Sequence, residues 1–576
     1  MKITGYSDKI SAAPGETLSF MVNCELPTYQ VEIVRIICGD SNPAGPGVRE
    51  KVIKTPANKT YKGRKQSIES GSYVTIPHSS ALAQLDSFSC QAMIWPTTPD
   101  RGQQVVMAKY QDRTKAGFAL VISERDGSLA LLLGDGHGNQ EILLTGKPLL
   151  AREWYFVAAS YDAKTRQVTL YQEPLVSYPL ATDAGEVHTK TKIAQLGDND
   201  VPLMFAACRT GTGKGQLACE YNGKIDSPRL ANRVLSRAEM EMLKSGPVPA
   251  TLTTAVVGVW DFSCDISSQK VTDVSPHRLH GHTVNLPARG MKGYNWTGES
   301  MNWGNKPDHY GAIHFHDDDI YDASWEVDFT LTIPATMKSG LYAARLQSGT
   351  EEDYIPFAVK PQPGKEKKIA FLLPAASYMA YANEHMGTNA GLIELFAGRL
   401  VPLDKYSLFL NEHREYGSSC YDVHSDHSGV CYSSRLRPIL NMRPKHISGL
   451  GGHGSSLWQF NADTHITDWL EALGYEFDVI TDEDLHNHGF ELLKPYAVIL
   501  SGTHPEYHSK SMWDAMMAYQ QQGGRLMYMG ANGWYWRIAY HPELPGAIEV
   551  RRNEGGIRTW AAEPGEYYHS FTGEYG

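Results

Sequence analysis

The sequence has few cysteines and no long apolar run, and each shortage excludes a class of protein. Its eight cysteines are spread over 576 residues without a CxxC pair, which fits reduced thiols better than a disulfide framework or a thiolate zinc site. No apolar stretch approaches the roughly 20 residues of a membrane-spanning helix, so we expect no membrane partner. The N-terminus, "MKITGYSDKISAAPGETL", lacks the apolar core of a secretory signal, which predicts a cytoplasmic location.

The chain is also short of basic residues. Lysine and arginine number 53 against 64 aspartates and glutamates, for a formal net charge of −11. Proteins that bind nucleic acids draw much of their affinity from clustered Lys and Arg, so we expect no nucleic-acid partner and a small neutral or cationic ligand instead. The length predicts three or four domains, at about 100–200 residues each.

Alternating apolar and polar residues near both ends of the first 362 residues predict a β-sandwich split in sequence. The stretch "SFMVNCELPTYQVEIVRIICGD" has the pattern of two half-buried strands. A similar pattern returns in "WEVDFTLTIPATMKSGLYAARLQSG", where we expect Trp325, Val327, Phe329 and Leu331 to share one face. We predict an immunoglobulin-like sandwich made of residues 1–62 and 250–362.

The segment between these halves, residues 63–249, predicts a second all-β domain. Its short strands include "GFALVISERDGSLALLLGDG" and "WYFVAASYDAKTRQVTLYQE". Together with "GKIDSPRLANRVLS", these strands resemble laminin-G and concanavalin-like jelly rolls. Such folds serve as sugar binders, adhesion modules or scaffolds, so the resemblance leaves the function open.

Strands that alternate with helices predict a doubly wound α/β domain over residues 365–576. The strands are expected in "KIAFLLPAASY", "EFDVITDEDL", "YAVILSG" and "RLMYMGANG", and the helices in "DTHITDWLEALGY" and "SKSMWDAMMAYQQQGG". The pattern resembles glutamine amidotransferases. Neither a G-x-C-x-G nor a G-x-S-x-G elbow is present, which disfavours an acyl-enzyme and makes metal-activated water the natural substitute.

Polar and aromatic side chains follow the predicted strands of this sheet. They lie in "ASYMAYANE", "THPEYHS" and "GANGWYW". Because ligands of open α/β sheets bind at the carboxyl ends of the strands, His504 and Glu506 are candidates for a site, although a solvated loop is the alternative interpretation. We expect Ser509 to cap the helix that follows.

The long polar segment 411–439 is the second candidate region, since loops beyond about 12–15 residues in a compact domain are usually functional or disordered. Tyr421, Tyr432, Arg435 and Arg437 are its most interesting residues. A metal site is an alternative that we do not favour, because the spacing does not match a closed tetrahedral site. That site would use Cys420, His424, His427 and Cys431.

Four segments in order, "ASYMAYANE", "YGSSCYDVHSDHSGVCYSSRLRP", "SGTHPEYHSKSMWDAM" and "GANGWYW", closely resemble the large subunits of N,N-dimethylformamidase. The likeness spans essentially the whole chain. It implies an iron-dependent amidohydrolase that cleaves N,N-dimethylformamide to formate and dimethylamine with metal-activated water. It further implies mononuclear Fe³⁺ held by Tyr381, Tyr421 and Glu506, with Tyr378 as the alternative to the first tyrosine. The implied catalytic residues are His504 and Asn532.

The same resemblance implies a partner. The family's large subunit works with a small alpha subunit in a hetero-oligomer, α2β2 or a multiple of it. A further catalytic glutamate of the family lies beyond the matched region, so we expect this chain to be a truncated large subunit. The rival functions are a metal-dependent hydrolase of sugar derivatives and a non-catalytic carbohydrate-binding or adhesion protein. Metal content and formate release would separate the three.

Overall fold

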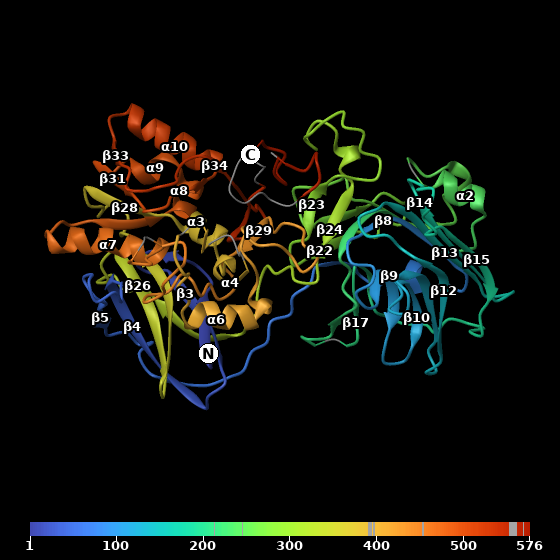
Figure 1. Ribbon diagram of the computed structural model, residues 1–576, viewed down its shortest axis with the longest axis horizontal. Helices are drawn as coiled ribbons and strands as arrows, with labels where there is room; N and C mark the ends of the chain where they lie inside the picture. The colour runs from blue at the N-terminus through green and yellow to red at the C-terminus, as the bar shows by residue number, and fades with distance from the viewer. Residues whose placement is uncertain are drawn as a thin grey trace.

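The computed structural model describes residues 1–83, 85–211, 213–244, 246–389, 394–395, 398–451, 454–551, 562–567 and 569–575. The molecule is elongated (Figure 1): a jelly roll forms one end, and a β-sandwich with a helix-flanked parallel sheet forms the other. Strand β29 (Tyr432–Ser434) lies between the two ends. Within the described ranges, no helix combines the length and the apolar character that a membrane crossing requires.

The sandwich joins the two ends of the predicted split. One sheet has the order β1-β3-β25 and the other contains β2-β27-β26-β4-β5, with β6 paired to β4. Their side chains share one apolar core that includes Phe20, Ile33 and Phe357. The strands are β1 (Ile3–Ser7), β2 (Ser11–Ala12), β3 (Thr17–Cys24), β4 (Thr28–Cys38), β5 (Arg49–Ile53), β6 (Thr60–Lys62), β25 (Val327–Thr332), β26 (Gly340–Ser348) and β27 (Glu351–Val359).

Two residues depart from the predicted face of the sandwich. Phe329 and Leu331 lie in its core. Trp325 is buried in a separate cluster, against Tyr6 and Tyr416, and Val327 is 52% exposed. The register between β25 and β3 shifts between Val327 and Phe329. Because the side chains of a strand alternate between faces, such a bulge turns the residue before it away from the core.

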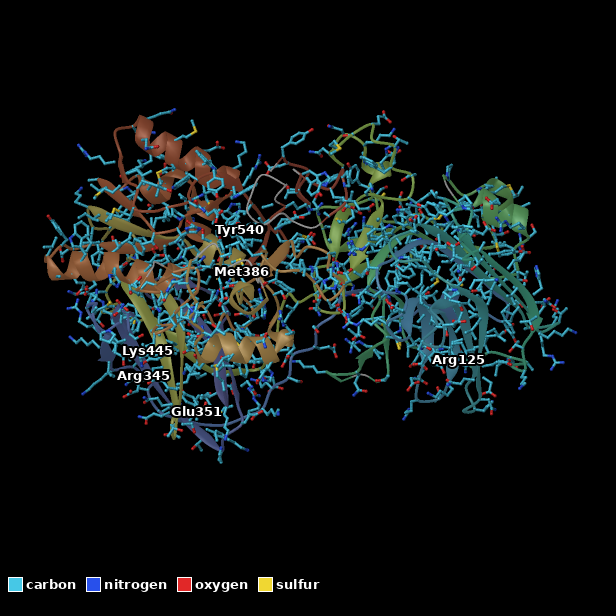
Figure 2. All side chains as sticks on the ribbon, viewed as in Figure 1. Arg125, Arg345, Glu351, Met386, Lys445 and Tyr540 are labelled. Atoms are coloured by element: carbon cyan, nitrogen blue, oxygen red, sulfur yellow. The ribbon has the colours of Figure 1, made fainter. Side chains whose placement is uncertain are left out.

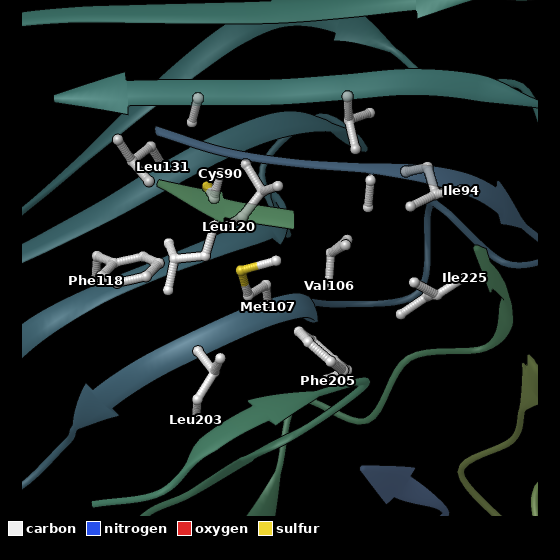
Figure 3. Close-up of a cluster of buried hydrophobic side chains, with 14 of the residues drawn as sticks. Cys90, Ile94, Val106, Met107, Phe118, Leu120, Leu131, Leu203, Phe205 and Ile225 are labelled. Atoms are coloured by element: carbon white, nitrogen blue, oxygen red, sulfur yellow. The ribbon is translucent and has the colours of Figure 1, made fainter. Parts of the chain in front are cut away.

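The predicted jelly roll is confirmed as a nearly closed sheet of sixteen strands. Figure 3 shows its core, in which Met107 and Leu120 of one layer face Cys90 and Ile94 of the other. The path of the sheet is β12 (Gln140–Pro148), β11 (Ser128–Asp135), β10 (Ala116–Ile122), β9 (Gln104–Gln111), β16 (Leu203–Phe205), β7 (Tyr73–Ile76), β22 (Gly281–Val284), β21 (Lys270–Asp273), β20 (Val256–Asp261), β19 (Gly223–Ala231), β8 (Phe88–Pro96), β13 (Tyr155–Asp162), β14 (Gln167–Pro174) and β15 (Gly185–Lys190).

Part of the segment 250–362, which the sequence assigns to the sandwich, belongs to this sheet instead. Strands β20 to β22, β23 (Ala288–Met291) and β24 (Ala312–Phe315) all pair within it. The cause is local pairing: β20 follows β19 after the short helix α2 (Arg237–Met242) and returns antiparallel beside it. The segment therefore supplies strands to both β units.

The predicted parallel sheet is present, with four strands in the order β30-β28-β31-β33. They are β28 (Ile369–Leu373), β30 (Asp478–Thr481), β31 (Val498–Ser501) and β33 (Arg525–Met527). Numbered along the chain, the order is 2-1-3-4, so the direction of winding reverses between β28 and β31. The likeness to glutamine amidotransferases stays a prediction.

Helices flank the sheet for reasons visible in the sequence. Helix α7 (Gln459–Ala472) packs against the sandwich, where the Gly39 amide donates to Thr464 Oγ1 over 2.9 Å. Helix α10 (Lys510–Gln521) begins at Ser509, whose hydroxyl caps it as predicted. Its buried residues Met512, Ala515, Met516 and Tyr519 recur at helical spacing. Shorter helices follow β28 and β30, namely α3 (Ala375–Ala380) and α8 (Asp482–His488).

Ion pairs lie on the surface of the sandwich and connect it to the 411–446 region. The side chain of Arg345 pairs with Glu32 and Glu50 across the sheet. Lys445 Nζ lies 2.6 Å from Glu352 and so joins the 411–446 region to β27. Figure 2 labels Arg345 and Lys445 close together on this part of the molecule. Because both are at least partly exposed, we assign them positional rather than large energetic roles.

Candidate active site

The reversal in strand order positions the candidate site. In open α/β sheets, ligands bind outside the carboxyl ends of the strands where the order reverses. Strand β28 leads into α3, and the backbone leaves that helix at Tyr381. Strand β31 leads into the loop that carries His504 and Glu506. The two neighbouring strands therefore deliver a phenol, an imidazole and a carboxylate to one edge of the sheet.

Glu506 is the centre of this site, and its side chain is buried. Its Oε2 atom accepts hydrogen bonds from Tyr381 Oη at 2.6 Å and from Tyr421 Oη at 3.1 Å. His504 Nε2 lies 3.0 Å from the same oxygen. The other carboxylate oxygen, Oε1, accepts from Tyr535 Oη at 2.8 Å. One carboxylate thus gathers three phenols and one imidazole.

The aromatic rings of the site pack directly on one another. Tyr381 and Tyr421 are stacked, with centroids 3.9 Å apart and planes 18° apart. Tyr421 Oη also lies 2.5 Å from Tyr507 Oη. The ring of Trp458 lies 4.5 Å from that of His504 and meets Tyr381 edge-on at 5.6 Å. These contacts hold the polar atoms of the site inside an aromatic enclosure.

Two helices hold the loop that carries Glu506. The Glu506 amide donates to Ser377 Oγ of α3 over 2.9 Å. The Thr503 amide donates to Asp463 Oδ1 of α7 over 2.5 Å. Gly502 has no room for a side chain, because a Cβ atom would lie 2.5 Å from Pro374. The loop is therefore positioned by α7 and by the residues that follow β28.

A buried arginine organises the segment that carries Tyr421. Arg437 is 1% exposed and donates to the carbonyl oxygens of Tyr416 and Ser418, at 2.7 and 2.9 Å. Burial lowers the pKa of Arg437 to about 10. Buried carbonyl oxygens of irregular backbone lack the amide partners that a helix or sheet would give them, and the Arg437 guanidinium supplies the missing hydrogen-bond donors.

The electrostatics of the site favour a charged Glu506 and a neutral Tyr381. Burial alone would raise the pKa of Glu506, but hydrogen bonds from His504 and Tyr381 outweigh it, and the pKa is lowered. Burial also raises the pKa of Tyr381 well above its usual value, and Tyr507 and Glu506 add to the effect. The Tyr381 phenol can lose its proton only if a cation compensates the charge.

The structure brings most of the predicted residues together. Tyr381, Tyr421, Glu506 and His504 all converge. Tyr378, the alternative to Tyr381, turns away and donates to Asp463. These contacts distinguish the two tyrosines, which the sequence alone leaves open.

Asn532 stands apart from the other predicted residues. Its side chain is exposed, and none of the hydrogen bonds found among the described residues joins it to Glu506 or His504. Its backbone is nevertheless close, because the Ala531 amide donates to the Thr503 carbonyl over 3.0 Å. The loop after β33 thus runs beside the loop after β31.

Three residues of the site were not predicted: Tyr507, Tyr535 and Trp458. Tyr507 and Tyr535 lie in the same segments at the strand ends that the sequence analysis singles out. That position is the sequence feature that could have identified them. An extended loop would send Tyr507 to the opposite side from Glu506. Instead, the short strand β32 (Tyr507–His508) pairs with β34 (Trp536–Arg537), and both phenols reach the cluster.

The other candidates in segment 411–439 lie elsewhere. Tyr432 contacts Phe571, with ring centroids 6.2 Å apart. Arg435 pairs with Glu483 at 2.9 Å. Among the described residues, the alternative set of Cys420, His424, His427 and Cys431 does not form a metal-sized group. His424 instead pairs with Asp318 of the jelly-roll half at 2.6 Å.

Comparisons with known proteins show which proteins this chain is similar to. The family profile described as "N,N-dimethylformamidase beta subunit-like, C-terminal" matches residues 288–576. The profile of the concanavalin A-like lectin/glucanases superfamily matches residues 69–241. The N,N-dimethylformamidase beta subunit of Paracoccus aminophilus is 39% identical over 596 residues, which cover 100% of this chain and 77% of that protein. The corresponding subunit of Alcaligenes sp. is 38% identical with the same coverage.

Among solved structures, a putative carbohydrate binding protein from Bacteroides ovatus is similar over 49% of this chain and 96% of its own. The TM-score is 0.27 and the sequence identity is 13%. That likeness is too weak to bear on function.

Proposed function

Because the chain belongs to the family of N,N-dimethylformamidase beta subunits, which are amidohydrolases, we propose that it hydrolyses N,N-dimethylformamide or a similar small formamide. The products would be formate and dimethylamine. One observation carries the proposal: two phenols and an imidazole meet on one oxygen of Glu506 at the reversal in strand order.

The donor set is suited to a ferric ion. Phenolate and carboxylate oxygens are hard, anionic ligands. Among the described residues, the side-chain partners of Glu506 are tyrosines and His504, and none is a lysine or arginine. The cluster can therefore become fully anionic only with a cation of high charge. We propose that Tyr381, Tyr421 and Glu506 hold one Fe³⁺, which when bound would supply Lewis acidity toward the amide and toward water.

A side chain of this protein would transfer the proton that hydrolysis requires. Hydrolysis adds water to the formyl carbon, and the nitrogen must gain a proton as the C–N bond breaks. His504 Nε2 is engaged by Glu506, whereas its Nδ1 is buried without a hydrogen-bond partner among the described residues. We assign His504 the transfer of a proton to the departing dimethylamine, since histidine suits transfer in either direction near neutral pH.

The walls of the site match a small tertiary amide. Dimethylformamide has two N-methyl groups and no N–H group, so a pocket that binds it needs apolar contacts and few hydrogen-bond donors. The rings of Trp458 and Tyr381 supply the apolar surface. Asn532 remains a proposed donor to the substrate, supported by the bond between its neighbour Ala531 and Thr503.

The similar proteins from Paracoccus aminophilus and Alcaligenes sp. are named beta subunits. We accordingly propose a cytoplasmic hetero-oligomer with a small alpha subunit, α2β2 or a multiple of it. The sandwich and the jelly roll are the units that we assign to contacts.

The experiment combines metal analysis with product analysis. The purified protein should contain about one iron per chain, absorb visible light through tyrosinate-to-iron charge transfer, and release formate from dimethylformamide. Zinc in place of iron, together with activity on sugar derivatives, would favour the rival hydrolase. A metal-free protein that binds carbohydrate and releases no formate would favour the adhesion protein.

A further inference from the structure

A second group of histidines and aspartates lies outside the site already described. It joins the jelly roll to segment 411–439. His314 belongs to strand β24, and His316 follows it by two residues. Asp426 belongs to segment 411–439, and all three side chains are buried. Their ligand atoms lie within 4.8 Å of one another.

Two atoms of this group face each other without a hydrogen bond. His314 Nε2 and Asp426 Oδ2 are buried, and apart from each other neither has a hydrogen-bond or ion-pair partner among the described residues. They lie 3.5 Å apart, which is beyond the usual range of an N–H···O bond. Two ligands about 2.0–2.2 Å from one tetrahedral zinc ion would stand roughly 3.3–3.6 Å apart. The spacing therefore suits a shared cation better than a direct contact.

The surrounding residues orient His316 as a metal-binding histidine is usually oriented. His316 Nδ1 lies 3.1 Å from Asp319 Oδ2, so the ring can donate its Nδ1–H to that carboxylate and leave Nε2 as the ligand atom. Asp319 is itself held by the Ser72 hydroxyl, at 2.6 Å. Ser428 Oγ lies 2.8 Å from His316 Nε2 and donates to Asp426 Oδ1 over 2.6 Å, so it bridges two members of the group. A bound ion would replace this bridge or take Ser428 as a further ligand.

The neighbouring His424 packs on His316. His424 pairs with Asp318 at 2.6 Å. The rings of His424 and His316 are stacked, with centroids 3.7 Å apart. This contact helps to fix the orientation of the His316 ring.

The group is also accessible to an ion. His314, His316 and Ser428 line a cavity of about 320 Å³, whose other walls include Trp95 and Lys224. This cavity supplies an entry path and room for a water ligand.

We propose that His314, His316 and Asp426 form a second metal site, specific for a divalent ion of the zinc class. Nitrogen and carboxylate ligands distinguish it from the all-oxygen site at Glu506. The ion would join strand β24 to the segment that carries Tyr421, five positions before Asp426. It would thus brace one wall of the active site from the jelly-roll side.

The test is metal analysis of the full chain after exposure to Zn²⁺ and removal of loosely bound ions. We expect about one zinc per chain in addition to any iron. His314→Gln and Asp426→Asn, which keep the side-chain size, should each lose that zinc. His188→Gln is the matched control, because His188 pairs with Glu186 on the exposed surface of the same jelly roll. It should keep the zinc.

Two further measurements distinguish failure of this proposal from misfolding of a variant and from failure of the proposed iron site. Co²⁺ in place of zinc should give the visible spectrum of a low-coordinate N/O site in the wild type, which needs no variant to fold. Tyr421→Phe should keep the second ion whether or not iron is found, so failure at one site is distinguishable from failure at the other. Wild-type protein that retains no zinc and gives no such Co²⁺ spectrum would overturn the proposal.

Discussion

Tyr381 and Tyr421 stack face to face, 3.9 Å between ring centroids, and donate to the same carboxylate oxygen of Glu506. They reach that point from different parts of the chain, one from the end of α3 and one from segment 411–439. Two phenols on one carboxylate oxygen make an arrangement that can exchange its protons for a cation.

The first prediction concerns the ligand role of Tyr421. Tyr421→Phe should remove both the iron and the visible absorption, because it deletes one of three anionic oxygens. Tyr432→Phe is the matched control, since Tyr432 lies on β29 against Phe571. Iron stoichiometry and an optical spectrum of each variant check this. Equal losses in both variants would contradict the assignment.

The second prediction separates His504 from Glu506. His504→Ala should keep the iron but release formate about 10²–10⁴-fold more slowly, the usual contribution of a positioned acid or base. Glu506→Ala should lose the iron. His508→Phe is the control from strand β32, two positions further on, because the His508 ring stacks on Trp534 and no hydrogen bond among the described residues joins it to the Glu506 carboxylate. Iron loss from His504→Ala would instead make the histidine a ligand.

The third prediction is a pH dependence of iron binding. The raised pKa of Tyr381 keeps its phenol protonated without a cation, so iron must displace that proton. Iron affinity should therefore rise with pH and fall as the solution is acidified. Iron titrations in weak buffer should show proton release on binding, with less release in Tyr381→Phe. Affinity that is independent of pH would argue against phenolate ligands.

The fourth prediction concerns the support of the Glu506 loop. Ser377→Ala removes the acceptor of the Glu506 amide and should lower the free energy of unfolding by about 1–2 kcal/mol. It should also weaken iron binding, because the loop loses its anchor on α3. Ser339→Ala deletes a comparable hydroxyl, which accepts from the Val479 amide away from the site. Urea denaturation should show a similar loss in both, and only Ser377→Ala should change iron affinity.

The sequence predicts those parts of the fold that depend on local pattern. The four parallel strands, the Ser509 cap and the jelly roll follow from runs of apolar residues and turn signals. The position of His504 and Glu506 follows from the rule for strand ends. The sequence pattern does not show which of Tyr378 and Tyr381 enters the site. The direction of each ring depends on where α3, a helix of only six residues, ends.

Strand pairing and register explain what the sequence analysis missed. The alternating pattern of β20 does not report that this strand pairs with β19 instead of joining the sandwich, and the bulge that exposes Val327 depends on the register with β3. The meeting of His316 with Asp426 requires the jelly roll and segment 411–439 to pack together. No periodicity within either segment reports such a contact.

The most direct test of the central claim is the rate of formate release from dimethylformamide as a function of bound iron. It uses preparations of the protein, purified together with the proposed alpha subunit, that differ only in iron content. The account predicts that the rate rises in proportion to iron occupancy, extrapolates to zero without iron, and tracks the charge-transfer absorption. Formate release that is independent of bound iron, or iron-loaded protein that releases none, would contradict it.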